Sequence, residues 1–491
     1  MDQPPDRKIA AMTVPKQEIQ ILAAILVAGA ALRAIGLDAQ LWFDEIATLV
    51  EFVRLPFGAI VSDYSSLNNH MFFTLQAKAA TLLFGEAAWS LRLPAALFGV
   101  GSIYLIWRLA RRYSQPRVAL SAAALTAFSY HHIWFSQNAR GYTELGFWCL
   151  AATIAYLSLL QAPRRASAIA LALSIAAALY THLTAGFFIA ALGLHYLARE
   201  GARLSRRETI SLAPFFAFAA GGLLALAAYA PALPSIIAQV SGVSGGSAVD
   251  VMQHYQNPLW AIAEGLRTLG GPPWFGFVAA SVALCALAFG AASLWRRSPA
   301  AVIITALSIL ITLAMLTALS MRVWPRFFFV QFPLLFWLLA EGANALLAVA
   351  RPRLARLSEP RIEARAFLLG MTVACGLSLA LAAKNYAAPK QDYEAAAAYV
   401  EAQGGAPAEI VAAGLAAFPY SVYYRPAFRQ AAEAEPEKIA NSQWVIIAFP
   451  SRTLRRYPEL AGALDREFEA PVRFKGTLGD GAILVYRRKA G

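Results

Sequence analysis

Two adjacent acidic residues, Asp44 and Glu45, follow the first long apolar segment of the chain directly after Trp42 and Phe43. Aromatic residues of this kind favour the membrane–water interface, where a carboxylate is costly and usually has a partner or a chemical task. Asp44 and Glu45 are therefore candidates for such a task. The structural alternative is that Asp44 caps a helix over residues 45–53, a frequent use of aspartate.

Several basic residues stand near the ends of apolar segments on the side of the membrane to which Asp44 is assigned below. Arginine suits bidentate contacts to phosphate or carboxylate, so an anionic ligand would explain this set. A single arginine near the end of a span can also reach lipid phosphates by snorkelling, but this explanation suits the whole set less well. The residues are Arg54, Lys78, Arg92, Arg140, Arg267, Arg322 and Arg326.

The composition indicates which elements must hold these residues. Of the 491 residues, 59% are hydrophobic and only 14% are charged, whereas a soluble domain has about 45 to 50% apolar residues even with glycine counted. The apolar residues gather in blocks of roughly twenty, the length that a helix needs to cross a bilayer. The sequence therefore predicts a polytopic α-helical membrane protein and excludes a soluble globule.

About eleven blocks are long enough to cross the membrane. A helix over residues 71–84 would extend only about 21 Å, less than the hydrocarbon core of roughly 30 Å, and this segment contains Gln76 and Lys78. We predict that it lies in the interface instead. The predicted spans cover residues 19–37, 93–110, 117–135, 142–160, 167–181, 185–198, 209–231, 272–294, 299–319, 327–350 and 366–383.

Charge placement predicts the orientation of these spans, because cytoplasmic loops hold the excess of Lys and Arg. With the N-terminus inside, every cluster of basic residues falls on the cytoplasmic side. The net charge of +13 therefore reflects the orientation of the chain in the membrane and does not indicate a nucleic-acid partner. We expect residues 1–385 to form the membrane domain. Residues 386–491, with 13 basic and 12 acidic residues and short β-prone runs, should form a small α/β domain outside.

Topology restricts where chemistry can occur. The longest predicted cytoplasmic loop, residues 350–365, is too short for a nucleotide-binding domain, and no GxxxxGK motif occurs. The long loops lie outside, over residues 38–91 and 231–271, and functional residues are often found on such loops. Residues 241–247 are rich in Gly and Ser, which is typical of a flexible loop or of a lid over a substrate.

Five short motifs follow one another on the outer side. They are Trp42-Phe43-Asp44-Glu45, Asn69-His70, Arg92-Leu93-Pro94, the run from Phe135 to Tyr142 and Pro325-Arg326-Phe327. The series resembles the GT-C membrane glycosyltransferases, and more narrowly the bacterial relatives of protein O-mannosyltransferases and lipid A aminoarabinose transferases (glycosyltransferase family 39-like). It covers roughly residues 41–333. Relatives commonly have His-Pro-Pro-Leu where this chain has His70-Met71-Phe72-Phe73, so the donor sugar is not predicted.

The resemblance implies a GT-C fold, a sugar donor linked to a polyprenyl phosphate, an outer active site and an acidic residue after the first span as the catalytic base. We assign that role to Asp44, with Glu45 positioning the acceptor or Asp44 itself. A polyprenyl phosphate leaves readily when cations neutralise its charge, so Arg and Lys can replace a general acid. For that phosphate we favour Arg92 and Arg326.

Other residues of the outer loops complete the expected site. No set of side chains shows the spacing of metal ligands, so no metal is assigned, and the adjacent histidines His131 and His132 are expected to pack or hydrogen-bond. A packed loop histidine is an equal alternative to substrate binding for His70. Further phosphate candidates are Lys78, Arg140 and Arg322, and candidate substrate-binding residues are Asp63, His70 and Tyr142.

We therefore predict an inverting glycosyltransferase of a bacterial inner membrane. It would move a sugar from undecaprenyl phosphate to a lipid, glycan or protein acceptor of the cell envelope, in the periplasm. A secondary transporter or lipid flippase is the main alternative, although such proteins tend to show paired repeats and broken helices that are not evident here. A membrane scaffold whose terminal domain recruits a partner is a third hypothesis.

Overall fold

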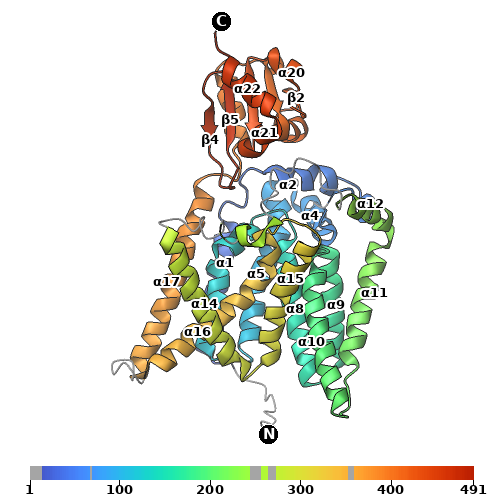
Figure 1. Cartoon of the computed structure of the whole chain (residues 1–491), viewed down its shortest axis with the longest axis vertical. Helices are drawn as coiled ribbons and strands as arrows, with labels where there is room; N and C mark the ends of the chain where they lie inside the picture. Colours follow the sequence, from blue (N-terminus) through green and yellow to red (C-terminus); the bar gives the residue numbers. More distant parts are fainter. Residues whose placement is uncertain are drawn as a thin grey trace.

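The computed structural model describes residues 14–66, 69–243, 256–261, 263, 273–351 and 359–490. Within these ranges, long helices form a bundle, and a small sheet with short helices lies beyond one end of it (Figure 1). The predicted fold class is confirmed, because the chain combines apolar membrane-length helices with a C-terminal mixed sheet. The Gly- and Ser-rich run predicted as a loop or lid lies outside the described residues from residue 244 onward.

Each predicted span contains a helix. Eight helices in the described part of the chain are long and apolar enough to cross a membrane, and α6 and α9 are shorter apolar helices. α10 is long but carries Arg199, Glu200 and Arg203. The bundle helices are α1 (Lys16–Ala34), α5 (Ala88–Ala110), α6 (Pro116–Phe128), α7 (Tyr130–Ser136), α8 (Tyr142–Gln161), α9 (Arg165–Thr181), α10 (Ala185–Ser205), α11 (Ala213–Tyr229), α14 (Pro273–Trp295), α15 (Pro299–Ala318), α16 (Phe332–Ala350) and α17 (Pro360–Ala387).

One predicted span is divided in two. Residues 117–135 were expected to form one helix, but α6 ends before Ser129, which has extended backbone angles. The Ser129 side chain accepts a hydrogen bond from the backbone N–H of His132 (3.3 Å) and so caps α7. Ser129 therefore ends α6 and starts α7 as a separate helix.

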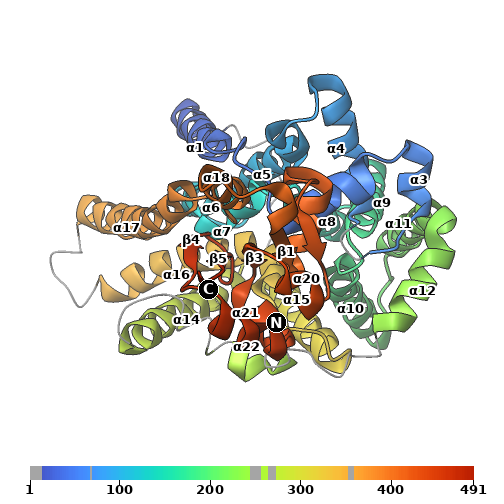
Figure 2. The same ribbon diagram turned by 90° about the horizontal axis from the view of Figure 1, so that it is seen from above.

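Short helices cover the end of the bundle that faces the α/β domain (Figure 2). α4 has the predicted bounds and packs against α5 and α9, while its position in the membrane interface stays a prediction. It ends at Gly85, whose φ of +86° favours glycine. The segments are α2 (Phe43–Ala47), the π-helix η1 (Thr48–Val53), α3 (Phe57–Ser62), α4 (Met71–Phe84), α12 (Leu233–Val243) and the 3-10 helix η4 (Pro325–Gln331).

The C-terminal domain contains a five-stranded sheet in the order β2-β1-β3-β5-β4. β1 pairs in parallel with β2 and β3, whereas β5 pairs antiparallel with β3 and β4. The strands and main helices are β1 (Ile410–Ala413), β2 (Arg429–Ala431), β3 (Trp444–Ala448), β4 (Val472–Phe474), β5 (Ile483–Arg487), α18 (Tyr393–Ala402), α20 (Pro436–Ala440), α21 (Pro450–Arg456) and α22 (Pro458–Glu467).

The two faces of this sheet have different neighbours. On one face, Val445 and Ile447 pack with side chains of α20 and α22. On the other face, Ile446 belongs to a buried cluster that also contains Leu41 and Ile46, from the segment around α2. The core of the C-terminal domain therefore continues into the segment that carries Asp44 and Glu45.

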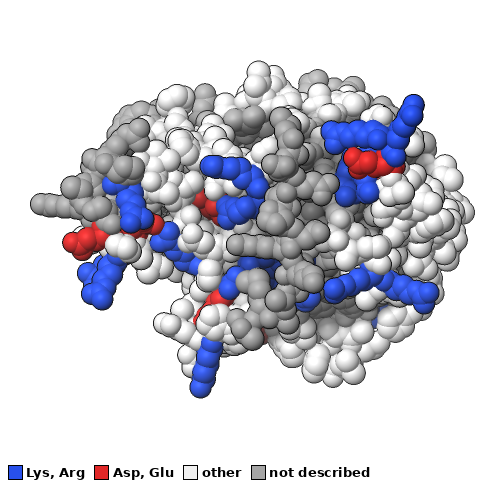
Figure 3. Space-filling view, turned by 90° about the horizontal axis from the view of Figure 1, so that it is seen from below, with Lys and Arg blue, Asp and Glu red and all other residues white. Residues whose placement is uncertain are grey.

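Basic side chains gather on the opposite end of the bundle, away from the α/β domain. Figure 3 shows Lys and Arg spread over this face with few acidic residues among them. Some are paired, as in the ion pairs Arg111–Glu18 and Arg117–Glu363 (both 2.7 Å). This distribution is the one that the positive-inside rule associates with a cytoplasmic face. The orientation itself stays a prediction.

α14 and α16 approach each other closely at two glycines. A Cβ atom on Gly290 would overlap the backbone carbonyl of Leu338, and a Cβ atom on Gly342 would overlap that of Ala286. Membrane helices use small residues at such contacts because their backbones can then touch. These glycines therefore set the distance between the two helices.

Replacing Gly342 with Ala should destabilise the protein by about 1 to 3 kcal/mol, because the added methyl group must push two backbones apart. Gly370 in α17 is the matched control, since a Cβ atom there meets open space, and Ala favours a helix more than Gly does. Thermal unfolding of the purified protein in detergent measures both variants. A G342A variant as stable as G370A would contradict the close packing.

Candidate active site

A narrow cavity of about 70 Å³ lies at the end of the bundle that faces the α/β domain. The start of α2, the end of α7, the start of α8 and the 3-10 helix η4 contribute its walls. It brings together one carboxylate, two arginines and several aromatic rings. The lining residues are Trp42, Asp44, Trp134, Phe135, Asn138, Arg140, Tyr142 and Arg326.

Asp44 faces this cavity, with 22% of its side chain exposed. Its Oδ2 accepts a hydrogen bond from Nη1 of Arg140 (2.8 Å). α2 begins at Phe43, two residues before the helix expected from the sequence, and the Glu45 carboxylate accepts from the backbone N–H of Trp42 (3.4 Å). The contact to the backbone ahead of α2 is thus made by Glu45, which leaves the Asp44 carboxylate directed to the cavity.

Glu45 is completely buried and lies outside the cavity. Arg92 donates to both of its oxygens, from Nε at 2.7 Å and from Nη2 at 2.6 Å. The backbone N–H of Ala139 donates to Oε1 (2.8 Å), and Nζ of Lys390 lies 3.6 Å from Oε2. Glu45 therefore connects four segments of the chain and offers no free oxygen to a substrate.

Charges around Glu45 decide its protonation. Burial alone would raise the pKa of Glu45, but the positive charges of Arg92 and Lys390 and the hydrogen bonds to the carboxylate lower it to about 2. Burial also lowers the pKa of Lys390 to about 7, against the opposing attraction of Glu45. Glu45 is thus ionised at neutral pH and acts as the negative centre of a buried network.

Arg92 is as deeply buried as its partner. Besides Glu45, it donates to the backbone carbonyls of Leu37 (2.8 Å), Ala39 (2.7 Å) and Gln40 (3.2 Å). A guanidinium has five N–H groups, and these contacts use all of them. This geometry argues against Arg92, one of the two arginines favoured from the sequence, as a phosphate ligand.

Arg326, unlike Arg92, can bind a phosphate. Its guanidinium lies over the rings of Trp324 and Phe327, 5.6 Å from each centroid. It has no hydrogen-bond or ion-pair partner among the residues that the structure describes. An unpaired cation in a partly apolar cavity attracts an anion strongly, because little water screens it.

His70 and Tyr142 stand beside Arg140. The backbone N–H of Gly141 donates to Nδ1 of His70 (2.9 Å), and Nε2 of His70 lies 3.2 Å from Nη2 of Arg140. Burial and the nearby positive charge of Arg140 hold the pKa of His70 well below its usual value, so the ring is neutral. Tyr142 packs edge-on against His70 (5.1 Å) and under the Arg140 guanidinium (5.7 Å). Since Nδ1 accepts from Gly141, the neutral ring carries its proton on Nε2 and cannot accept a hydrogen bond from Arg140. The Tyr142 ring is therefore the contact of the two that holds the arginine beside Asp44.

Three more predicted site residues lie outside the cavity lining, as Glu45, Arg92 and His70 do. Lys78 donates to the backbone carbonyl of Val53 (3.0 Å), and the Asp63 carboxylate accepts from the backbone N–H of Ser65 (2.7 Å). Arg322 does not line the cavity either. Within the described residues no group of three His, Cys, Asp or Glu side chains is placed to hold a metal ion.

Some residues of the site were not singled out from the sequence. Asn138 accepts a hydrogen bond from the Trp42 indole (2.8 Å) and fixes its ring at the cavity wall. Its place in the run from Phe135 to Tyr142 was a usable signal. Lys390 and Gln391, which contact Glu45 and the Phe43 backbone, gave no such signal, because nothing in their local sequence indicates what they touch.

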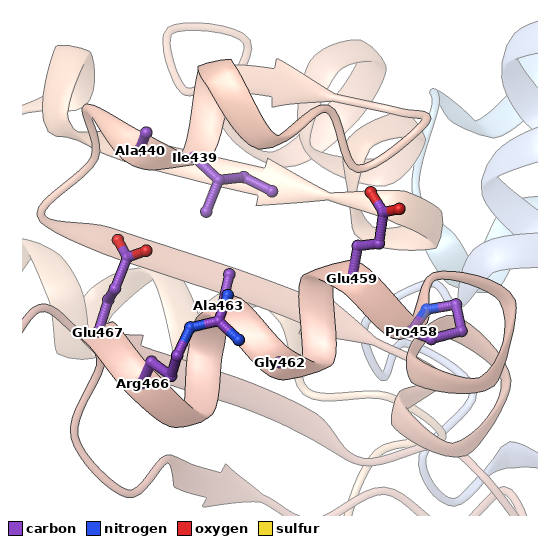
Figure 4. A pocket seen from close by; sticks show the side chains of 8 residues that line it. All are labelled: Ile439, Ala440, Pro458, Glu459, Gly462, Ala463, Arg466 and Glu467. Carbon is purple, nitrogen blue, oxygen red and sulfur yellow. The ribbon is translucent and has the colours of Figure 1, made fainter.

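A wider groove lies between α20 and α22 in the C-terminal domain (Figure 4). α20 and α22 cover the sheet face that is turned away from the α2 segment. The groove is therefore separate from the cavity around Asp44. Its lining residues are Ile439, Ala440, Pro458, Glu459, Gly462, Ala463, Arg466 and Glu467.

Replacing Glu45 with Gln should destabilise the protein at pH 7 by about 3 to 5 kcal/mol, because Arg92 is then left buried without its counter-charge. The pKa of Glu45 is lowered from its ordinary value of 4.5, so its stabilising effect is present above pH 4.5 and is lost as the pH falls toward 2. The difference between wild type and E45Q should therefore shrink between these pH values.

Denaturation of both proteins at pH 7 and pH 3 measures this change. Glu86→Gln is the control, since Glu86 forms an exposed ion pair with Arg54 (2.7 Å), and such pairs contribute little. If E45Q destabilises the protein at pH 7 as little as E86Q does, the buried network does not depend on the charge of Glu45.

Residues 71–234 match the family described as dolichyl-phosphate-mannose-protein mannosyltransferase. No curated protein sequence matches the chain at a significant level. Among solved structures, ArnT from Cupriavidus metallidurans in the apo state is 16% identical, with a TM-score of 0.52 over 97% of this chain and 98% of that one. The same protein bound to undecaprenyl phosphate has a TM-score of 0.50 at 16% identity over 96% of this chain and 98% of its own.

A third similar structure is the oligosaccharyltransferase of Archaeoglobus fulgidus in the apo form. It is 13% identical, with a TM-score of 0.52 over 98% of this chain and 75% of that one. At these identities the likeness shows the fold, and the family match adds the enzyme class predicted from the motifs. This chain is a multi-pass membrane protein with the GT-C fold of membrane glycosyltransferases, and its residues 71–234 are similar to the dolichyl-phosphate-mannose-protein mannosyltransferase family.

Proposed function

We propose that this protein transfers a sugar from a polyprenyl phosphate, such as undecaprenyl phosphate, to an acceptor of the bacterial cell envelope. The observation that carries the proposal is the shared cavity of Asp44 and Arg326, in which a carboxylate and an unpaired guanidinium face the same space. The two groups match the two charges of the reaction, the proton that leaves the acceptor and the phosphate that leaves the sugar. Structures of ArnT with undecaprenyl phosphate and of AglB, the oligosaccharyltransferase of Archaeoglobus fulgidus, with dolichol phosphate support this class of donor.

Asp44 acts as the general base in this proposal. The acceptor oxygen or nitrogen attacks the anomeric carbon of the donor sugar, and the Asp44 carboxylate takes the proton that the acceptor loses. Arg140 holds that carboxylate at 2.8 Å and so restricts its rotation. A single displacement of this kind inverts the configuration of the anomeric carbon.

Arg326 stabilises the leaving group. The bond between the anomeric carbon and the phosphate oxygen breaks, its electrons stay on the phosphate, and a polyprenyl phosphate leaves with additional negative charge. A preorganised cation stabilises such developing charge without the need for a proton. The cavity of about 70 Å³ is smaller than the 300 Å³ or so of a typical ligand pocket. We therefore place the sugar and acceptor at its open side.

The buried pair of Glu45 and Arg92 has a positioning role in this scheme. Neither group lines the cavity, and their hydrogen bonds are made within the protein. Glu45 is the next residue after Asp44, so its fixed side chain also fixes the start of α2. The pair determines where the base points and does not touch the substrate.

We further propose that the cavity and the α/β domain face the periplasm and that the membrane is the bacterial inner membrane. The basic side chains at the opposite end of the bundle support this orientation, since cytoplasmic faces carry the excess of Lys and Arg (Figure 3). A polyprenyl-phosphate donor would then enter the cavity from the outer leaflet.

Replacing Asp44 with Asn should reduce the turnover number at least about a hundredfold, the lower range for loss of a general base, while the protein stays folded. Asp465→Asn, an exposed position in α22, is the matched control and should keep wild-type turnover. The measurement is transfer from undecaprenyl-phosphate-linked sugars, followed by mass spectrometry of the lipid products. Near-normal turnover in D44N would remove Asp44 from the mechanism.

Replacing Arg326 with Gln should raise the KM for the donor about tenfold or more, because one charge-assisted contact to the phosphate is lost. Arg365→Gln is the control, since Arg365 is an exposed residue near the start of α17. Donor titrations with the two variants measure the effect. An unchanged KM and turnover number in R326Q would exclude Arg326 as a phosphate ligand.

A further inference from the structure

The C-terminal domain is fastened to the segment that carries Asp44. The hydroxyl of Tyr424 donates to the backbone carbonyl of Leu41 (2.5 Å), and the Gln391 side chain accepts from the backbone N–H of Phe43 (3.1 Å). The Gln40 side chain donates to Asp392 (2.7 Å). These contacts fix the domain next to the cavity, so its side chains can contribute to the site.

Arg452, in α21, belongs to this domain and lies outside the lining of the narrow cavity. Its guanidinium lies over the ring of Phe449, 4.9 Å from the centroid. Phe449 in turn packs edge-on against Phe43, with 5.9 Å between the ring centroids. Phe43 directly precedes Asp44, so two ring contacts connect Arg452 to the neighbour of the proposed base.

The guanidinium of Arg452 has no hydrogen-bond or ion-pair partner within the described ranges, and its Nε is buried. An acid of the same domain, Asp480, accepts from the backbone N–H groups of Ser451 and Arg452 at 3.1 Å each. That carboxylate therefore holds the start of α21 and does not form an ion pair with the arginine side chain.

The charges around Arg452 belong to the cavity region as well as to its own domain. Burial lowers the pKa of Arg452, and Asp480 raises it; Arg322 and Arg326 lower it further, while Asp44 raises it. Two arginines from the membrane domain thus repel Arg452. Such a concentration of positive charge is unfavourable in the empty site and becomes favourable when an anion binds there.

We propose that Arg452 is a further phosphate-binding residue of the active site, which binds the phosphate of the polyprenyl donor together with Arg326. The inference rests on the proposed function, because it names the ligand of the same site. It makes the C-terminal domain part of the donor site, in addition to its packing role. Arg452 and Arg326 approach from different domains, so the phosphate would be held between them.

Binding of undecaprenyl phosphate to the purified full-length protein tests this assignment without any need to know the sugar or the acceptor. We expect Arg452→Gln and Arg452→Met to weaken binding about tenfold. Met keeps an apolar stem on Phe449, so agreement of the two variants separates charge from packing. Arg452→Lys should restore affinity to within about threefold, since the positive charge is retained.

The matched control is Arg455→Gln, in the same helix at an exposed position, which should bind as the wild type does. Undecaprenol, which lacks the phosphate, should bind equally to all variants. Melting temperatures identify any variant that is unfolded, and the comparison then uses the other uncharged variant. If the folded uncharged variants bind undecaprenyl phosphate as tightly as wild type, Arg452 is not a phosphate ligand.

The two proposals fail in different ways. Wild-type protein that does not bind undecaprenyl phosphate would overturn the polyprenyl donor and, with it, the role of Arg452. Wild-type binding that is unaffected by R452Q and weakened by R326Q would overturn only the role of Arg452. Equal loss of undecaprenol binding in R452Q and R452M would also overturn it, because the effect would then not involve the phosphate.

Discussion

The ion pair between Glu45 and Arg92 is the interaction on which the rest of the site depends. Both side chains are buried, and burial of two charges is favourable only when each has a full set of partners. Arg92 uses all five N–H groups, and Glu45 adds the Ala139 backbone and Lys390 to its contacts. The pair thereby joins the end of α1, the start of α5, the loop before α8 and the C-terminal domain.

This arrangement gives two adjacent acids different tasks. Successive residues of a helix point about 100° apart, so the start of α2 directs Glu45 into the protein and Asp44 into the cavity. One carboxylate is fully buried and charged to hold the structure, whereas the other keeps partial exposure beside Arg140. The rigid neighbour supplies the orientation that a base needs, because small displacements of a reacting group are costly in rate.

The helices of the bundle were predictable because each long apolar block shows its length directly in the sequence. The break at Ser129 was not, since the apolar composition continues through it. For the candidate site, the order of the motifs on one side of the membrane was enough to select Asp44, Arg140 and Arg326, which line the same cavity. It could not show that Glu45 and three backbone carbonyl groups occupy all N–H groups of Arg92. Nor could it show the positions of Lys390 and Arg452, because these depend on how a distant domain docks.

The contact between Glu45 and Lys390 joins residues separated by most of the chain. Ribosomes make the N-terminal side first, at about 5 to 20 residues per second, so the α2 segment exists well before its partners in the C-terminal domain. A partly synthesised chain would hold Asp44 on a segment that is still free to move. The final position of the Asp44 segment is therefore reached only after the C-terminal domain has been made.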